Sequence, residues 1–197
     1  MQGEFEFYKR LPVRPARPER LFFCLLPDVA TSVRVRQFAE RLVCDNWLKG
    51  TLLKAERLHV SLQHVGDDTR LRTKVVYAAR LAGDAVSMRA FELAFPFLQS
   101  FGPTALEEDV ARRRPLVLLG EGDALLELHA MLGAAMEKNG LKARPHFTPH
   151  MTLLYGSKAL PHQAIEPIRF TVREFVLIHS ELGLTRYNVV ERWPLDD

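Results

Sequence analysis

The chain has 197 residues, of which 47% are hydrophobic and 26% are charged, with a formal net charge of +3. This composition is that of an ordinary globular protein and excludes a disordered or collagen-like chain. A pI near 9.0 would suit an anionic partner but is also common among proteins that bind none, so charge alone assigns no function.

The sequence gives no sign of a membrane or secreted protein. No apolar run is long enough to span a bilayer, and the N-terminus interleaves charged and aromatic residues where a signal peptide would have an apolar core. The two cysteines, Cys24 and Cys44, lack metal-ligand spacing, and we expect both to be reduced thiols. We therefore expect a soluble, cytoplasmic protein.

Prolines, glycines and hydrophobic periodicity divide the chain into short elements. Prolines among arginines predict an extended basic arm over residues 1–18. We expect residues 19–197 to form a single domain, because no Gly/Ser-rich or charged linker divides them. The first half predicts, in order, a strand over residues 21–26, a helix over 29–45 capped by Asp28 or Thr31, a loop over 46–56, a strand over 57–65 that ends at residues 66–68, a helix over 69–82, and a strand over 86–95 that ends at Pro96.

The second half repeats this order with altered lengths. It predicts a strand over residues 115–119, a turn over 120–123, a helix over 124–138, a second strand that begins near His150, a loop holding Pro161 and Pro167, and final strands near 170–179 and 185–193. This is an imperfect duplication about a hundred residues long. We therefore expect an α+β fold of two similar lobes, each a mostly antiparallel sheet with helices outside, lining a central cleft.

One four-residue motif recurs at corresponding places of the two halves, at residues 59–62 and 150–153. It consists of His, an apolar residue, a small hydroxyl residue and Leu. Side chains alternate along a strand, so each His shares a face with the hydroxyl two residues on. A third match, residues 146–148, precedes Pro149, which cannot donate to a sheet, so we interpret it as a loop. The shared setting of the first two matches makes them a stronger signal than a chance His-x-hydroxyl.

Two imidazoles that share a cleft can divide the acid–base work at a phosphodiester. With an ordinary pKa of about 6.5, one can take a proton from an attacking water or hydroxyl while the other protonates the departing oxygen. The hydroxyls of Ser61 and Thr152 can donate hydrogen bonds to the non-bridging phosphoryl oxygens. This chemistry requires no metal and no other cofactor.

These motifs resemble those of the two-histidine phosphoesterase superfamily, and within it the bacterial RNA 2′,3′-cyclic phosphodiesterases, also called 2′-5′ RNA ligases. Residues 20–28 resemble the family's first strand and helix start, residues 147–153 its second motif, and residues 185–195 its C-terminal strand. The resemblance implies the family's bilobal fold. It also implies that His59 and His150 are the catalytic pair and that Ser61 and Thr152 bind phosphate.

The resemblance implies hydrolysis of a 2′,3′-cyclic phosphate at the 3′ oxygen, leaving a 2′-phosphate, with 2′-5′ ligation as a reverse activity. We expect His150 to be the base on water and His59 the acid on the leaving oxygen. The expected partners are RNA ends or cyclic nucleotides as substrates, with no membrane and no obligate protein partner, and the expected state is a monomer. Two departures concern the substrate: Ser61 replaces the commoner Thr, and Tyr155 stands where bacterial members often have an Arg, so a charged phosphate contact there is lost or supplied elsewhere.

Other candidate residues have simpler structural interpretations. His64 lies at an odd offset from His59 and is expected on the opposite face, and His129 lies within an amphipathic helix. His146 and His150 have the helical spacing of a metal pair, but Pro149 between them argues against that helix. We therefore expect no metal site.

A run of three arginines, residues 112–114, predicts either a solvated charged segment or a contact with RNA phosphates. The rings of Phe147, Tyr155 and Trp193 could stack on a base or pack against the protein. Competing functions are an RNA-binding module of the same fold with little catalysis, and a phosphodiesterase for another cyclic phosphate or for 2′-5′ oligonucleotides.

Overall fold

The computed structural model describes residues 19–102, 113–181 and 186–197, so the predicted arm over residues 1–18 and Arg112 lie outside the described residues. The described elements are β1 (Glu19–Leu25), α1 (Val29–Asn46), β2 (Gly50–Leu52), a 3₁₀ turn η1 (Ala55–Arg57), β3 (Val60–Asp68), α2 (Thr73–Asp84), β4 (Phe91–Ser100), β5 (Arg114–Glu121), α3 (Asp123–Lys138), β6 (His150–Gly156), β7 (Gln163–Val172), β8 (Glu174–Glu181) and β9 (Arg186–Pro194).

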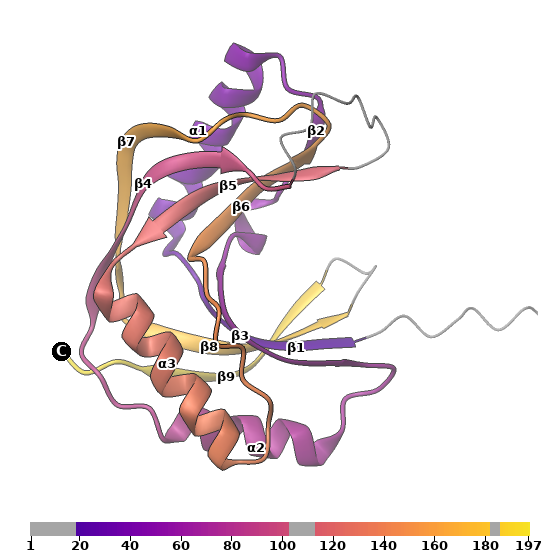
Figure 1. Ribbon diagram of the computed structural model, residues 1–197, viewed down its shortest axis with the longest axis vertical. Helices are drawn as coiled ribbons and strands as arrows, with labels where there is room; N and C mark the ends of the chain where they lie inside the picture. The colour runs from indigo at the N-terminus through magenta and orange to yellow at the C-terminus, as the bar shows by residue number, and fades with distance from the viewer. Residues whose placement is uncertain (1–18, 103–112, 182–185) are drawn as a thin grey trace, which may run out of the picture.

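The described strands pair antiparallel in one nine-stranded sheet of order β7-β4-β5-β6-β3-β1-β8-β9, with β2 beside β6. The link between β3 and β6 is a single residue pair, Val60 opposite Met151. We call β2, β4, β5, β6 and β7 the upper half-sheet and β1, β3, β8 and β9 the lower half-sheet. Figure 1 shows the two half-sheets diverging from this link. The predicted α+β fold with two similar antiparallel lobes is confirmed, and the lobes form one continuous sheet.

The helices connect the two half-sheets by crossing over between them. Helix α1 follows β1 of the lower half-sheet but contacts β6 and β7 of the upper one, whereas α3 follows β5 of the upper half-sheet but contacts β3 of the lower one. Helix α2 packs against α3 and β9. The helices therefore cover the outer sides of the lobes (Figure 1), and neither lobe corresponds to one half of the sequence.

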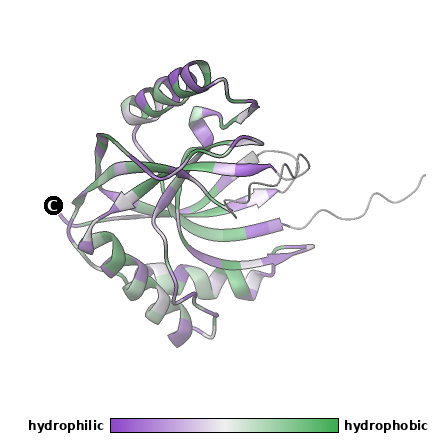
Figure 2. Cartoon of the chain, turned by 45° about the horizontal axis from the view of Figure 1, so that its top comes forward, coloured by the Kyte–Doolittle hydropathy of each residue, from purple (hydrophilic) through white to green (hydrophobic). Residues whose placement is uncertain are grey.

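Strand β1 is buried on both faces, as its continuous apolar run predicts. Leu21, Phe23 and Leu25 belong to the main core. Phe22 and Cys24, on the other face, belong to a second, smaller cluster. Figure 2 shows the apolar residues concentrated along the strands, while the helices carry apolar and polar residues on different faces. The lower half-sheet thus has an apolar layer on each of its sides.

Two prolines that were expected outside strands lie inside them. Pro96 was predicted to end a strand, but β4 continues to residue 100. The register of β4 shifts between Ala94 and Phe97 where β4 meets β5, and β4 has one extra residue there, so Pro96 lies in a bulge. A bulged residue needs no ladder hydrogen bond, which is why the sheet tolerates this proline. Pro167, predicted in a loop, lies in β7 in the stretch opposite this bulge.

Three further boundaries differ from the predictions. Residues 66–68 continue β3 instead of ending it. The predicted loop over residues 46–56 contains β2 and most of η1. The predicted strand over residues 170–179 is the end of β7 and the start of β8, divided at Arg173. Each of these differences depends on pairing with a distant strand, which local sequence patterns do not contain.

Helices α1 and α3 begin within one residue of their predicted positions, whereas α2 begins at Thr73, four residues after its predicted start. Of the two caps predicted for α1, Asp28 is the N-cap: its carboxylate accepts hydrogen bonds from the backbone N and the hydroxyl of Thr31 at 2.8 and 2.7 Å. These hydrogen bonds hold the pKa of Asp28 below its usual range. Within the described residues, every helix is too short or too polar to cross a bilayer.

Gly83 of α2 provides a test of this packing. A methyl group on Gly83 would lie 2.3 Å from two ring carbons of Trp193, whose Nε1 donates a hydrogen bond to Asp84 at 2.7 Å. We predict that Gly83→Ala lowers the free energy of unfolding by about 1–3 kcal/mol, measured with urea, because overpacking outweighs the gain in helix propensity. The control is Gly66→Ala, where a methyl group would meet nothing within 4 Å. It should change the free energy by less than about 0.5 kcal/mol; equal effects of the two variants would contradict the packing described.

Candidate functional site

The pair of Val60 and Met151 brings the two histidine motifs together. Both side chains are fully buried, at 0% exposure. Extending this antiparallel register by one residue in each direction places His59 beside Thr152 and Ser61 beside His150, on the face opposite the buried pair. These four side chains line one cavity. The two copies of the motif thus form a single site with approximate two-fold symmetry.

A β-bulge follows each motif at the same place. Where β3 pairs with β1, Leu62 is the extra residue, and where β6 pairs with β5, Leu153 is the extra residue. Each bulge shifts the alternation by one, so the residue five positions after each His faces the cavity: His64 on β3 and Tyr155 on β6. The prediction that His64 lies on the face opposite His59 is wrong for this reason, because it assumed unbroken alternation.

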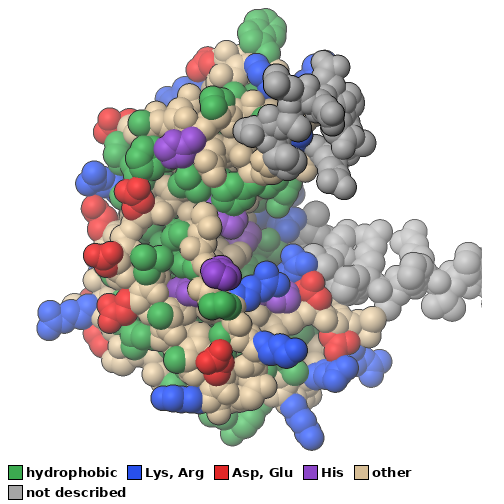
Figure 3. All heavy atoms as spheres, in the orientation of Figure 1, with side chains coloured by type: hydrophobic (Ala, Val, Ile, Leu, Met, Phe, Trp, Pro, Cys, Tyr) green, Lys and Arg blue, Asp and Glu red, His purple; other side chains and the backbone are tan. Residues whose placement is uncertain are grey.

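The cavity has a volume of about 700 Å³ and lies between the half-sheets. Its described lining contains one carboxylate, that of Asp67, and four cationic side chains, those of Arg20, Lys54, Arg57 and Arg144. Figure 3 shows histidine and basic side chains gathered in the hollow between the two halves. A concave surface with this excess of positive charge attracts anions.

The carboxylate of Asp67 is already paired within the protein. The guanidinium of Arg20 donates to both of its oxygens at 2.8 Å, and Nε2 of His64 lies 2.8 Å from one of them. The hydrogen bond from Arg20 holds the pKa of Asp67 far below its usual range. Arg20 and Asp67 therefore neutralise each other, and the positive character of the cavity comes from its other cationic groups.

The two motif histidines are oriented in the same way by the backbone. Nδ1 of His59 lies 2.8 Å from the carbonyl oxygen of Arg57, and Nδ1 of His150 lies 2.7 Å from the carbonyl oxygen of Thr148. A carbonyl oxygen can only accept a hydrogen bond, so each Nδ1 carries the hydrogen and donates it. In both rings Nε2 is left free to take or give a proton, which is what a general acid or base requires.

The surroundings of the two histidines differ. The ring of His59 packs against both Phe22 and Tyr187, with centroids 5.4 and 5.5 Å away. This burial lowers the pKa of His59; the hydrogen bond to the carbonyl of Arg57 raises it, and the charges of His150 and Arg57 lower it further. His150 has one aromatic neighbour, Phe101, at 4.9 Å among the described residues, and its hydrogen bond to Thr148 is exposed. The neutral form of His59 is therefore favoured in the empty cavity.

Other residues considered from the sequence lie outside the cavity. Phe147, predicted to contact substrate, is not part of the lining: it stacks on His129 with centroids 4.3 Å apart. Trp193 is buried against Phe175 in the core. His146 is exposed and does not line the cavity. Among the residues that the structure describes, no three or more His, Cys, Asp or Glu side chains are grouped so that they could hold a metal ion.

The structure also adds residues that sequence reasoning missed. Arg57 lies two residues before His59, so the same alternation that linked His59 to Ser61 could have indicated it. Arg144 comes from a loop and Tyr187 from β9, and no local pattern connects either of them with the motifs. Their convergence on the cavity depends on the tertiary fold.

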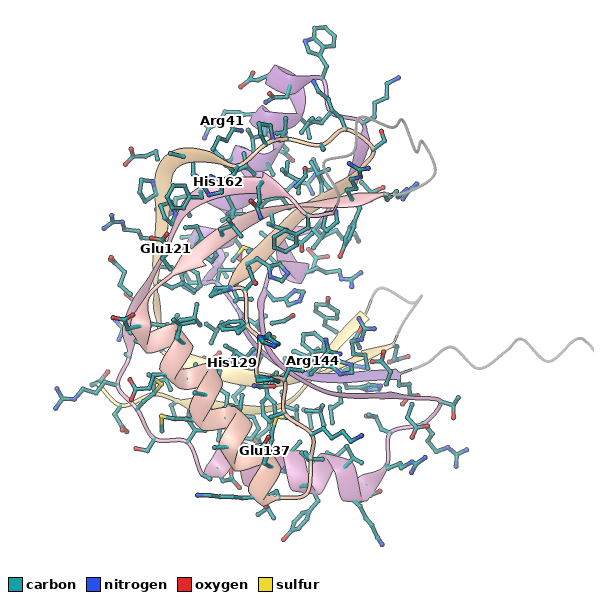
Figure 4. All side chains as sticks on the ribbon, viewed as in Figure 1. Arg41, Glu121, His129, Glu137, Arg144 and His162 are labelled. Atoms are coloured by element: carbon teal, nitrogen blue, oxygen red, sulfur yellow. The ribbon has the colours of Figure 1, made fainter. Side chains whose placement is uncertain are left out.

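Gln63, which is buried on β3, holds the loop that leads into β6. Its Oε1 accepts a hydrogen bond from the backbone N of Arg144 at 2.9 Å, and its Nε2 donates to the carbonyl of Arg144 at 3.2 Å. The same Nε2 lies 2.9 Å from Nε2 of His129, which must accept because an amide nitrogen only donates. His129 is thus neutral, and its burial lowers its pKa. Figure 4 shows His129 on α3 beside Arg144.

We predict that Gln63→Leu lowers the free energy of unfolding by about 2–3 kcal/mol, because it leaves buried backbone groups of Arg144 and the ring of His129 without partners. Chemical denaturation at pH 7.5 measures the change. The matched control is Gln99→Leu: Gln99 is half-buried on β4, and its side chain forms no hydrogen bond with any described residue. A loss in Gln63→Leu no larger than that in Gln99→Leu would show that Gln63 does not hold the loop.

Comparison with known proteins identifies relatives of this fold. The family model described as the 2′-5′ RNA ligase superfamily matches residues 27–184. The crystal structure of E. coli LigT in apo form is similar, with a TM-score of 0.65 and 24% sequence identity over 92% of this chain and 99% of that chain. The structure of E. coli LigT complexed with 3′-AMP gives a TM-score of 0.64 and 25% identity over 91% and 99% of the two chains.

A thermophilic protein with lower sequence identity has the same fold. TT0787 of Thermus thermophilus has a TM-score of 0.69 and 18% identity over 89% of this chain and 97% of that chain. A search of curated protein sequences gave no significant match. At these sequence identities the solved structures establish the fold, and the match to the family model establishes the family to which the sequence is related.

Proposed function

The chain belongs to the 2′-5′ RNA ligase superfamily, and from this premise we propose that it is a metal-independent phosphodiesterase that hydrolyses 2′,3′-cyclic phosphates of RNA ends or nucleotides to 2′-phosphates. The observation that carries the proposal is the paired arrangement of the cavity. Two imidazoles, each held with Nε2 free and each beside a hydroxyl, face the same space. A phosphorus centre between them would have a base on one side and an acid on the other.

The reaction follows from this arrangement. The base removes a proton from water as the water oxygen attacks phosphorus, and the bond between phosphorus and the 3′ oxygen breaks. The acid gives its proton to that oxygen, so the products are a 2′-phosphate and a free 3′ hydroxyl. The hydroxyls of Ser61 and Thr152 donate hydrogen bonds to the non-bridging oxygens as their charge grows. With an RNA 5′ hydroxyl in place of water as the nucleophile, the same groups would open the cyclic phosphate to give a 2′-5′ linkage and a free 3′ hydroxyl.

The pKa of His59 supports a division of roles opposite to the one expected from the sequence. A base must be neutral before the reaction and an acid must be protonated. Burial against Phe22 and Tyr187 lowers the pKa of His59 and favours its neutral form. We therefore assign His59 as the base on water and His150, which lies in the more exposed position, as the acid on the leaving oxygen. Local sequence patterns do not contain this difference in burial.

The rest of the lining suits a nucleotide. Tyr155, which is exposed on β6, offers an aromatic ring on which a base can stack. Lys54 and Arg144 are both exposed and can contact further phosphates of a longer RNA. Cyclic phosphates of other nucleotides and 2′-5′ oligonucleotides carry the same groups, and a panel of such substrates would rank them by kcat/KM.

The first test is direct. In the presence of EDTA, the purified protein should convert 2′,3′-cyclic AMP to 2′-AMP. Chromatography separates the substrate from the product and measures the conversion. We expect His59→Ala and His150→Ala to lower kcat/KM by about 10²- to 10⁴-fold, and Ser61→Ala and Thr152→Val each to lower kcat by about 10²-fold. His162→Ala is the matched control, because His162 is exposed and packs on Phe97 away from the cavity. Absence of product from both cyclic nucleotides and cyclic phosphate RNA ends would refute the enzyme and favour an RNA-binding module.

The pH dependence of kcat/KM tests the assignment of roles, because it reports the pKa values of the free enzyme. A base loses activity as pH falls through its pKa. Since the pKa of His59 is lowered, the acid limb should lie below the ordinary value of about 6.5. The residual activity of His150→Ala should keep this acid limb, and that of His59→Ala should lose it and keep the alkaline limb. The opposite pattern would restore His150 as the base and His59 as the acid.

A further inference from the structure

Arg57 stands out among the cationic groups of the cavity because, among the described residues, its side chain is partly buried and its charge has no partner. Among the described residues, Arg20 forms an ion pair with Asp67, and Nζ of Lys54 lies 3.8 Å from Oε1 of Glu56, so both of these charges have an acidic partner. No ion pair or side-chain hydrogen bond joins Arg57 to any described residue, and its Nε is buried without a hydrogen-bond partner. A buried polar group normally has a partner, and a partly buried guanidinium facing a cavity is available for an anionic ligand.

The position of this guanidinium is fixed by an aromatic ring. Its central carbon lies 4.4 Å from the centroid of the Tyr187 ring. The same ring lies against His59, with centroids 5.5 Å apart, and against Phe22, with centroids 5.8 Å apart. The guanidinium lies over the ring of Tyr187, and its N–H groups that point away from the ring can donate to an acceptor such as two phosphate oxygens.

The backbone of Arg57 ties this group to the reacting histidine. Its carbonyl oxygen accepts the hydrogen bond from Nδ1 of His59. On the other side of the site, the corresponding carbonyl belongs to Thr148, whose side chain has no charge. The cavity-facing residue that follows the second motif, Tyr155, is also not a cation. Among the described residues, Arg57 is therefore the arginine whose charge acts directly on a motif histidine, His59.

We propose that Arg57 is a substrate-binding residue of this site: its guanidinium, held over Tyr187, donates paired hydrogen bonds to the non-bridging oxygens of the phosphate that lies between His59 and His150. The proposal rests on the proposed function for the identity of that phosphate. Tyr187 acts as a positioning residue, because it holds the guanidinium and does not touch the phosphate. Arg144, also unpaired but exposed on a loop, contacts more distant parts of a ligand.

The experiment measures phosphate binding and turnover separately. Isothermal titration calorimetry with inorganic phosphate gives an affinity that does not depend on catalysis, and kcat/KM for 2′,3′-cyclic AMP gives turnover. The variants are Arg57→Gln, Arg57→Lys, Tyr187→Leu and Tyr187→Phe, and the control is Arg173→Gln, which removes one charge at an exposed site near the C-terminus. The backbone carbonyl that orients His59 remains in every variant, and thermal denaturation checks that each one folds.

We expect Arg57→Gln to weaken phosphate binding by about tenfold or more and to lower kcat/KM by about 10²-fold. Arg57→Lys should recover part of the affinity, because it keeps the charge without the fork of donors. Tyr187→Leu should weaken binding while Tyr187→Phe should resemble the wild type, because the ring and not its hydroxyl supports the guanidinium. Arg173→Gln should bind phosphate as the wild type does.

The outcomes separate this proposal from the proposed function. Unchanged phosphate affinity in Arg57→Gln, with activity that still depends on His150, would overturn the role of Arg57 and leave the function standing. A moved acid limb of the pH profile without weaker phosphate binding would also overturn it, because Arg57 would then act only on the charge of His59. Weaker phosphate binding in Arg57→Gln by a protein that hydrolyses no cyclic phosphate would support Arg57 and refute the function.

Discussion

The single pairing between Val60 and Met151 is the constraint on which the rest of the site depends. Because the pairing is antiparallel and both side chains are buried, the residues on either side of each must point the opposite way, into the space between the half-sheets. Those residues are the histidines and hydroxyls of the two motifs. Since the half-sheets diverge beyond this pair (Figure 1), the four side chains meet at the bottom of a cavity instead of packing against a continuous flat sheet. This one residue pair thus determines both where the two half-sheets join and where the histidines and hydroxyls of the motifs lie.

The two-fold arrangement at this junction explains why the two halves share so many details. Each histidine donates from Nδ1 to the carbonyl two residues earlier, and each motif is followed by a bulge at its Leu. The symmetry ends at the side chains around the motifs. His64 and Tyr155 occupy equivalent places, and His59 is enclosed by two rings where His150 is more open. A symmetric backbone therefore supplies two similar groups, and packing that differs between the two sites lowers the pKa of His59.

The fold class could be predicted from periodicity and the duplication, and the pairing of the motifs across one cleft from the duplication together with the resemblance to the two-histidine phosphoesterases. Alternation alone placed His59 with Ser61 and His150 with Thr152, and the apolar run of β1 correctly indicated burial on both faces. The failures share one cause. A bulge depends on the register with a partner strand, so the sequence around His64 and Pro96 could not reveal that the alternation breaks there. The crossing of α1 and α3 between lobes, and the arrival of Arg144 and Tyr187 at the cavity, likewise depend on long-range packing.

The charges around the motifs favour one protonation pattern over the others. In the empty cavity, the charges of His150 and Arg57 add to burial in opposing the protonation of His59, so a state with both rings protonated is disfavoured. A phosphodiester carries a negative charge, and between the rings it would compensate a proton on one of them without a need for a second. Substrate binding would thus stabilise the state in which one imidazole is neutral and the other protonated, which is the state that acid–base catalysis uses.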